Sequence, residues 1–144
     1  PYMKNRTRQM ISTPKLYILD TGLAAYLTSW NTPETLMNGA AAGYFFESWC
    51  FAEILKSYTN AGISPDLTYY RDKDDNEIDL IIQRNGVLYP VECKKAGTVK
   101  KDNVKAFAKL RIFDQPTGMG ALISMYPELQ LLREDVRTIP AWRL

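Results

Sequence analysis

Three acidic residues and one lysine in this sequence are of the types that metal-assisted phosphate chemistry uses. Glu47, Asp79 and Glu92 carry carboxylates, and Lys94 follows Glu92 after one intervening residue. Mg²⁺ prefers oxygen ligands and is commonly held by one or two carboxylates, with water and substrate phosphate completing its coordination. A lysine beside such a group can orient an attacking water or hold the scissile phosphate. These four residues therefore predict a catalytic site for phosphodiester hydrolysis.

Two strands of a predicted hairpin would bring most of these residues together. The apolar runs 78–83 and 87–93 flank Asn85-Gly86. This dipeptide is typical of two-residue hairpin turns, because both of its positions tolerate positive φ. Counting outward from the turn places Asp79 opposite Glu92 across an antiparallel pair. The hairpin is thus the element that we expect to position both carboxylates.

The same hairpin predicts which residues share a face of the sheet, because side chains alternate along a strand. The expected apolar face holds Ile78, Leu80, Ile82, Tyr89, Val91 and Cys93, and the expected polar face holds Glu77, Asp79, Glu92 and Lys94. Like charges directly opposite each other destabilise a strand pair by roughly 0.2–1 kcal/mol. Mg²⁺ or Mn²⁺ would neutralise the two opposed carboxylates, so we expect Asp79 and Glu92 to be metal ligands.

Glu47 is expected on a helix that packs against the hairpin. Apolar residues between positions 40 and 58 recur at helical spacing. The neighbours of Glu47 at three and four positions are Gly43, Tyr44, Cys50 and Phe51. An unpaired charge is costly in such surroundings, so Glu47 needs a partner. That partner is either the metal, directly or through water, or a basic residue such as Lys94 or Arg71.

The remaining pattern is that of one α/β domain with alternating strands and helices. Further strands are predicted at 16–19, 67–71, 121–125 and 130–132, and further helices at 20–27 and 102–113. The chain has no histidine, and Cys50 and Cys93 lack the spacing of a zinc site. Any metal must therefore be bound by oxygen.

The charge distribution says more about partners than the net charge does. A formal charge of +2 is too small to indicate nucleic-acid binding by itself. Basic residues cluster at 4–15 and 94–111, and each cluster taken alone is ordinarily a solvated surface. Beside a carboxylate site, the 94–111 stretch is a candidate phosphate track. No apolar run approaches the length of about 20 residues that spans a bilayer, so we expect a cytoplasmic protein without a membrane segment.

The order of Glu47, Asp79 and then Glu92-Cys93-Lys94 resembles the E…D…ExK signature of the PD-(D/E)XK nuclease superfamily. The segments LYILDTGLA (16–24), FE (46–47), YYRD (69–72), EID (77–79) and VECK (91–94) resemble the domain of unknown function at the C-terminus of many bacterial and archaeal AAA-type ATPases. This similarity spans nearly the whole chain. It implies a restriction-endonuclease-like core, in which helices flank a mixed central β-sheet.

The resemblance also implies an activity and partners. Asp79, Glu92 and Glu47 would hold Mg²⁺ or Mn²⁺, and Lys94 would position water or phosphate during cleavage of nucleic acid, with double-stranded DNA as the first expectation. Residues 1–144 would form a single domain at the C-terminal end of a longer ATPase, which accounts for a start at Pro1. The sequence has no GxxxxGK[ST] loop, so we expect no ATP site in these residues.

Two other hypotheses remain open at this stage. A nuclease fold without activity can serve as an accessory domain that tethers the ATPase to DNA or to a protein, because fold does not dictate chemistry. A weaker alternative is a domain that forms oligomeric contacts for the ATPase. Structural ion pairs also assemble charged clusters, so Asp79 and Glu92 can instead be solvated or paired with Lys94 and Arg71. Metal binding separates these hypotheses, since a tether needs no divalent cation.

Overall fold

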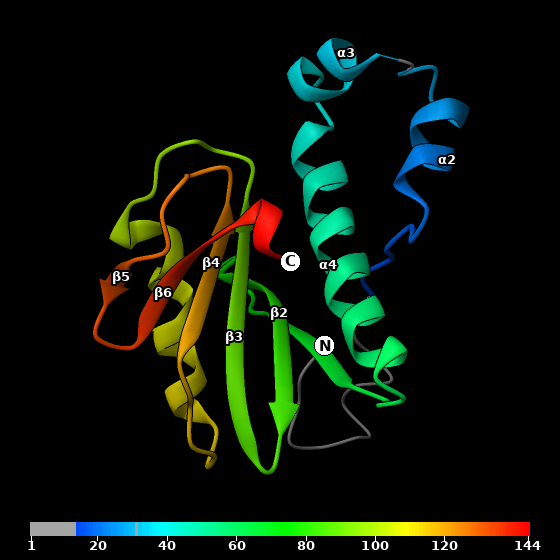
Figure 1. Ribbon diagram of the computed structural model, residues 1–144. Helices are drawn as coiled ribbons and strands as arrows, with labels where there is room; N and C mark the ends of the chain where they lie inside the picture. The colour runs from blue at the N-terminus through cyan, green and yellow to red at the C-terminus, as the bar shows by residue number, and fades with distance from the viewer. Residues whose placement is uncertain (1–13, 31) are drawn as a thin grey trace.

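The structure is a computed structural model that describes residues 14–30 and 32–144. Within these residues a six-stranded β-sheet forms the centre, with the long helix α4 on one face and the 3₁₀ helix η1 on the other (Figure 1). The helices are α2 (Thr21–Leu27), α3 (Pro33–Asn38), α4 (Ala42–Asn60), η1 (Lys101–Ile112) and η2 (Ala141–Arg143). The strands are β1 (Asp66–Arg71), β2 (Glu77–Arg84), β3 (Val87–Lys94), β4 (Gly120–Ser124), β5 (Leu131–Arg133) and β6 (Val136–Pro140).

The sheet is mixed in its strand directions. Its spatial order is β1-β2-β3-β4-β6-β5. The first three strands are antiparallel, β4 lies parallel to both β3 and β6, and β5 returns antiparallel to β6. The parallel step from β3 to β4 requires a crossover, which η1 supplies. The predicted α/β fold, a mixed central sheet flanked by helices, is confirmed at this level.

The three predicted helices are confirmed as α2, α4 and η1. Asp20 caps α2 by accepting a hydrogen bond from the backbone N–H of Leu23 at 2.8 Å. The crossover helix η1 is a 3₁₀ helix with a kink at Val104, and the short helix α3 was not predicted. Among the helices of the described residues, none has the length and apolar character that spanning a bilayer requires.

The predicted strands differ from the structure at two places. The segment 16–19 has no regular secondary structure, so the prediction of a strand there is wrong. This apolar, partly β-branched run instead packs Tyr17 on α4 and leaves Leu16 and Ile18 exposed, and neither arrangement requires a neighbouring strand. Strand β6, which ends at Pro140, was not predicted, whereas β1, β4 and β5 match predicted strands.

The Asn85-Gly86 turn joins β2 and β3 as predicted. Arg84 pairs with Val87, and the antiparallel ladder continues to the pair Leu80 and Val91. The φ angles of Asn85 and Gly86 are 52° and 77°, which lie in the left-handed region that a two-residue hairpin requires. The turn therefore sets the register that carries the carboxylates of the hairpin.

Gly86→Ala is expected to lower the free energy of unfolding by about 1 kcal/mol, because a Cβ disfavours the left-handed conformation. No heavy atom lies within 4 Å of the position that this Cβ would take, so the cost is conformational. Gly43→Ala in α4 is the matched control, since its Cβ also meets nothing within 4 Å and alanine favours a helix. Urea unfolding should move in opposite directions for the two variants, and a neutral Gly86→Ala would contradict the assigned turn.

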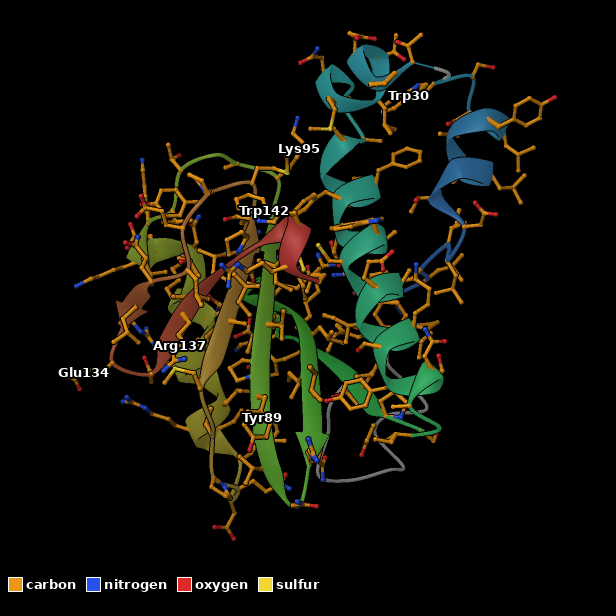
Figure 2. All side chains as sticks on the ribbon, viewed as in Figure 1. Trp30, Tyr89, Lys95, Glu134, Arg137 and Trp142 are labelled. Atoms are coloured by element: carbon orange, nitrogen blue, oxygen red, sulfur yellow. The ribbon has the colours of Figure 1, made fainter. Side chains whose placement is uncertain are left out.

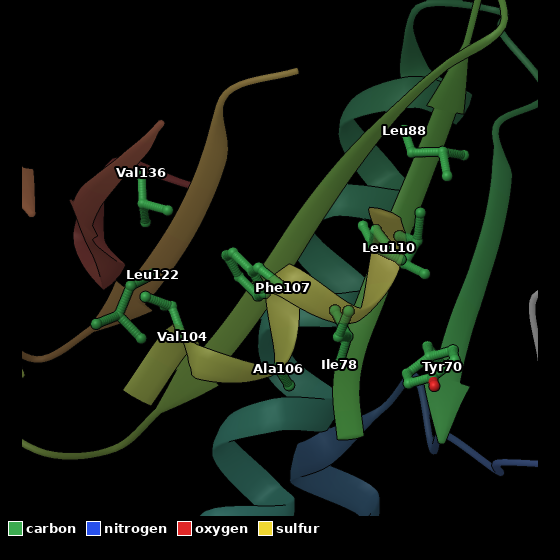
Figure 3. Close-up of a cluster of buried hydrophobic side chains, with 10 residues drawn as sticks. Tyr70, Ile78, Leu88, Val104, Ala106, Phe107, Leu110, Leu122 and Val136 are labelled. Atoms are coloured by element: carbon green, nitrogen blue, oxygen red, sulfur yellow. The ribbon is translucent and has the colours of Figure 1, made fainter. Parts of the chain in front are cut away.

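Both faces of the sheet are covered by apolar side chains. On the η1 face, Phe107 and Leu110 pack with sheet residues that include Ile78 and Leu122 (Figure 3). On the α4 face, the packed residues are Phe46, Cys50, Ile54, Leu80, Val91, Cys93, Ile123 and Ala141. The hairpin therefore has a core on each side, and the expectation of one apolar and one polar face is wrong.

Candidate active site

A β-bulge in β2 aims Asp79 toward the site. Thr68 of β1 pairs with Ile81 and Tyr70 pairs with Ile78, so β2 has one more residue than β1 between these pairs. Ile78 consequently packs on the η1 face and Leu80 on the α4 face, although simple alternation would put both on one face. This extra residue is why the predicted alternation fails at Asp79.

Asp79 is fixed by the backbone of the neighbouring strand. The paired ladder between β2 and β3 ends at Leu80 and Val91, one step before the predicted pairing of Asp79 with Glu92. There the backbone N–H of Cys93 donates a 2.8 Å hydrogen bond to Oδ2 of Asp79. This bond orients the carboxylate of Asp79, which is only 6% exposed. The second oxygen of Asp79, Oδ1, lies 3.5 Å from the ammonium of Lys15, which precedes the hairpin in the sequence.

Glu92 is a buried carboxylate with only one of its oxygens paired among the described residues. It is 5% exposed, and its Oε1 lies 2.6 Å from Nζ of Lys94. Its Oε2 is buried without a hydrogen-bond partner among the described residues. Burial first, and then the negative charge of Asp79, raise the pKa of Glu92 to about 7. A buried carboxyl group with a pKa of about 7 and one oxygen unbonded by the described residues can bind either a proton or a cation.

Glu47 reaches the site from α4. Phe46, Cys50 and Ile54 recur at intervals of four residues and bury one side of this helix against the sheet. Glu47 follows Phe46 and is directed to the edge of that interface, where its Oε1 accepts a hydrogen bond from the Tyr17 hydroxyl at 2.9 Å. Burial, and then the charge of Asp79, raise the pKa of Glu47. Glu47 therefore pairs with Tyr17 and with Lys15, and not with the Lys94 or Arg71 that the sequence suggested.

Lys15 is the main residue that sequence reasoning missed. Its Nζ lies 2.5 Å from Oε1 of Glu47, 2.5 Å from Oε1 of Glu77 and 3.5 Å from Oδ1 of Asp79. Burial alone would lower the pKa of Lys15, but its bonds to Glu47 and Glu77 raise it above its ordinary value, so the side chain stays charged. In the sequence this segment shows only a lysine two positions before a tyrosine, ahead of the helix cap Asp20, and such a pattern carries little information.

Tyr17 fastens the same segment to the site. Its ring stacks on Phe51 of α4, with 4.1 Å between centroids and 5° between planes. Its hydroxyl lies 3.0 Å from the backbone oxygen of Asp79 as well as 2.9 Å from Oε1 of Glu47. Burial, and then the charge of Glu47, raise the pKa of Tyr17, so the phenol remains a hydrogen-bond donor.

An open pocket of about 920 Å³ gives access to this group. Glu47, Asp79 and Lys94 line it together, so the structure brings three of the four predicted residues to one surface. The fourth, Glu92, is joined to that surface through its contact with Lys94. Burial alone would lower the pKa of Lys94, but Glu92 raises it, so the ammonium remains available to a phosphate.

The basic stretch 94–111 does not line one continuous surface. Lys94 lines the site pocket, whereas Lys101 and Arg111 line a separate pocket of about 480 Å³. Lys95 donates to the backbone oxygen of Met37 at α3, and Figure 2 shows it at the α3 end of the molecule. Lys109 pairs with Asp72 at 3.5 Å. The basic residues 4–8 predicted with Lys15 lie outside the described residues.

The donor atoms suit a hard divalent cation, but their present arrangement does not form a complete coordination site. Within the described ranges, no three acidic, cysteine or histidine side chains are grouped closely enough to hold a metal ion. The available donors are carboxylate oxygens, which Mg²⁺ and Mn²⁺ prefer, and Oε2 of Glu92 lacks a partner among the described residues. The ammonium of Lys15 now neutralises Glu47 and Asp79.

Comparison with known proteins gives a family but no individual relative. A family model described as a domain of unknown function, DUF4143, matches residues 42–144, from the first residue of α4 onward. No curated protein and no solved structure matches the chain. The matched range contains Glu47, Asp79, Glu92 and Lys94, whereas Lys15 and Tyr17 precede it. Because the match covers most of the sequence, the chain belongs to the DUF4143 family of domains of unknown function.

Proposed function

We propose that this domain is a metal-dependent nuclease with a restriction-endonuclease-like core of the PD-(D/E)XK type. Its substrate is nucleic acid, with double-stranded DNA as the first choice, and it acts as a C-terminal module of an AAA-type ATPase. The observation that carries the proposal is the convergence of Glu47, Asp79, Glu92 and Lys94 from α4, β2 and β3. A helix bearing Glu47 and hairpin strands bearing the other three are what the nuclease resemblance implies.

Each residue of the site would have a separate role in this reaction. Asp79 and Glu92 supply oxygen ligands, and the bond from Cys93 holds Asp79 in place before a substrate arrives. Glu47 borders the pocket beside Asp79 as a third ligand or as an acceptor for a bound water. Lys94 places a positive charge where a phosphodiester gains negative charge during hydrolysis. Mg²⁺, when bound, supplies Lewis acidity toward the phosphate and the water.

One observation favours a second candidate function, an inactive accessory domain with a nuclease-like fold that binds DNA or a protein for the ATPase. The ammonium of Lys15 already contacts Glu47, Glu77 and Asp79. A permanent internal cation would satisfy these carboxylates without any metal. The two candidates therefore differ in whether Asp79 and Glu92 bind a divalent ion at all.

Calorimetric titration of Mn²⁺ and Mg²⁺ tests the proposal. We expect binding to the wild-type chain and a loss of at least about 10–100-fold in affinity in Asp79→Asn/Glu92→Gln, which removes both charges and keeps both shapes. The matched control is Asp66→Asn/Glu134→Gln, which changes the net charge equally. Asp66 begins β1 and Glu134 lies at the sheet edge far from α4, as Figure 2 shows for Glu134. Neither residue lines the site pocket.

The result separates the two candidates. Metal binding that depends on Asp79 and Glu92, together with Mg²⁺-dependent cutting of double-stranded DNA, would support the nuclease. A wild-type chain that binds no divalent ion, even with a DNA oligonucleotide present to complete the coordination, would leave the accessory domain as the better interpretation.

A further inference from the structure

The segment 14–19 lies across the acidic site and contributes two side chains to it. Lys15 directs its ammonium at three carboxylates, and it is the only cation besides Lys94 that the described residues place in ion pairs with Glu47, Asp79 or Glu92. Leu16 between the two contributed side chains is 88% exposed, and Ile18 after them is 51% exposed. The segment is thus a narrow strap with Lys15 and Tyr17 facing inward.

The attachment of the strap depends on polar contacts with the site itself. The described hydrogen bonds of the strap to the remaining domain come from Lys15 and Tyr17, and they end on Glu47, Glu77 and Asp79. The stacking of Tyr17 on Phe51 adds the apolar part of the attachment. A change in the charge of the site therefore acts directly on the groups that hold the strap.

The ammonium and a divalent cation compete for the same oxygens. A metal ligated by Oδ1 of Asp79 or Oε1 of Glu47 would lie within a few Å of Nζ of Lys15, because that atom is 3.5 Å and 2.5 Å from these oxygens. Two positive charges at such a separation repel, and each loses the carboxylate that the other takes. Both cannot occupy these contacts at once.

We propose that Lys15 is a built-in counter-cation, and that binding of a divalent metal displaces Lys15 together with the strap 14–19. This inference rests on the proposed function for the claim that the carboxylates bind metal. It adds a mode of regulation, since the strap holds the site in a metal-poor state. Any factor that draws the strap away raises the affinity of the site for its metal.

The first test is Mn²⁺ calorimetry on Lys15→Met, which keeps the length of the side chain and removes its charge. We expect Mn²⁺ to bind at least about tenfold more tightly than to the wild-type chain, because the competing charge is gone. The matched control is Lys56→Met, which makes the same charge change on α4 at an exposed ion pair with Glu53. The control should bind Mn²⁺ as the wild type does.

The second test detects displacement of the strap directly. Trypsin cleaves after lysine, and the side chain of Lys15 is only 20% exposed while it contacts the carboxylates. Saturating Mn²⁺ should raise the rate of cleavage at the Lys15–Leu16 bond several-fold, as measured by mass spectrometry. In Asp79→Asn/Glu92→Gln the same Mn²⁺ concentration should leave the cleavage rate unchanged.

Tyr17→Phe keeps the test decisive if Lys15→Met does not fold. This variant retains Lys15 and the ring that stacks on Phe51, and it removes the hydroxyl that bonds Glu47. We expect a smaller gain in Mn²⁺ affinity and faster trypsin cleavage at Lys15.

The outcomes separate the two proposals. Equal or weaker Mn²⁺ binding to Lys15→Met and Tyr17→Phe, with cleavage that does not respond to Mn²⁺, would overturn the displaceable strap and leave the metal site standing. Absence of Mn²⁺ binding to the wild type and to every variant would overturn both proposals.

Discussion

Lys94→Met is expected to lower the rate of Mg²⁺-dependent DNA cleavage by about 10²–10³-fold, because removal of one charge that stabilises a phosphoryl transition state has an effect of that size. Lys94 lines the site pocket and lies 2.6 Å from Glu92. It is not a metal ligand, and its loss removes a positive charge beside Glu92, so the affinity for Mn²⁺ should not fall below the wild-type value. Single-turnover cleavage of a supercoiled plasmid measures the rate, and calorimetry measures the affinity.

Lys95→Met is the matched control for this experiment. It removes the same charge one residue later, but Lys95 contacts the backbone oxygen of Met37 and does not line the site pocket. We expect its cleavage rate to resemble that of the wild type. Equal losses in Lys94→Met and Lys95→Met would indicate a general contribution to DNA binding and would remove Lys94 from the catalytic assignment.

Glu92→Gln is expected to stabilise the fold in alkaline solution and to change its stability little in acid. The pKa of Glu92 is raised from 4.5 to about 7 by burial and by Asp79, with Glu47 adding to the rise and Lys94 opposing it. A carboxyl whose pKa is raised on folding stabilises the fold below its unfolded pKa, and this contribution is lost as the pH rises through the folded pKa. The loss therefore falls between about pH 4.5 and 7 and amounts to about 3 kcal/mol.

Glutamine removes this pH dependence because it is neutral throughout. The rise of the Glu92 pKa to about 7 is what remains after the opposing effect of Lys94, so this pairing does not reduce the difference further. The variant should be more stable than the wild type by about 2–3 kcal/mol near pH 8 and by less than about 1 kcal/mol near pH 5.

Urea unfolding without divalent metal, at both pH values, measures the difference. The matched control is Glu53→Gln on α4, which makes the same substitution at a partly exposed carboxylate that pairs with Lys56 outside the site. A Glu92→Gln chain less stable than the wild type near pH 8 would mean that the pair with Lys94 outweighs the cost of burying the charge.

The parts of the fold that the sequence predicted correctly have local causes. The Asn85-Gly86 turn requires only positive φ at two adjacent positions, and α4 requires only apolar residues at helical spacing. These patterns sufficed to select Glu47, Asp79, Glu92 and Lys94, and the structure brings them together.

The parts that the sequence did not predict depend on distant partners. The bulge at Asp79 exists because β1 pairs with β2 in a particular register, which simple alternation along β2 cannot reveal. Lys15 finds its carboxylates 32, 62 and 64 residues away, so no local pattern marks it. The segment 16–19 has the apolar, partly β-branched composition of a strand, but a strand also needs a neighbour to pair with, and this segment packs on α4 instead.

The bond from the backbone of Cys93 to Asp79 limits how the middle residue of the Glu92-Cys93-Lys94 triplet can vary. The donor is a backbone N–H, so nineteen of the twenty amino acids can provide it and proline cannot. The side chain at this position is buried against α4 beside Cys50, so only small or medium apolar residues fit there. Among related sequences, the size of the residue at position 93 should therefore be limited by the space beneath α4. The requirements on Glu92 and Lys94 at the flanking positions are independent of that space.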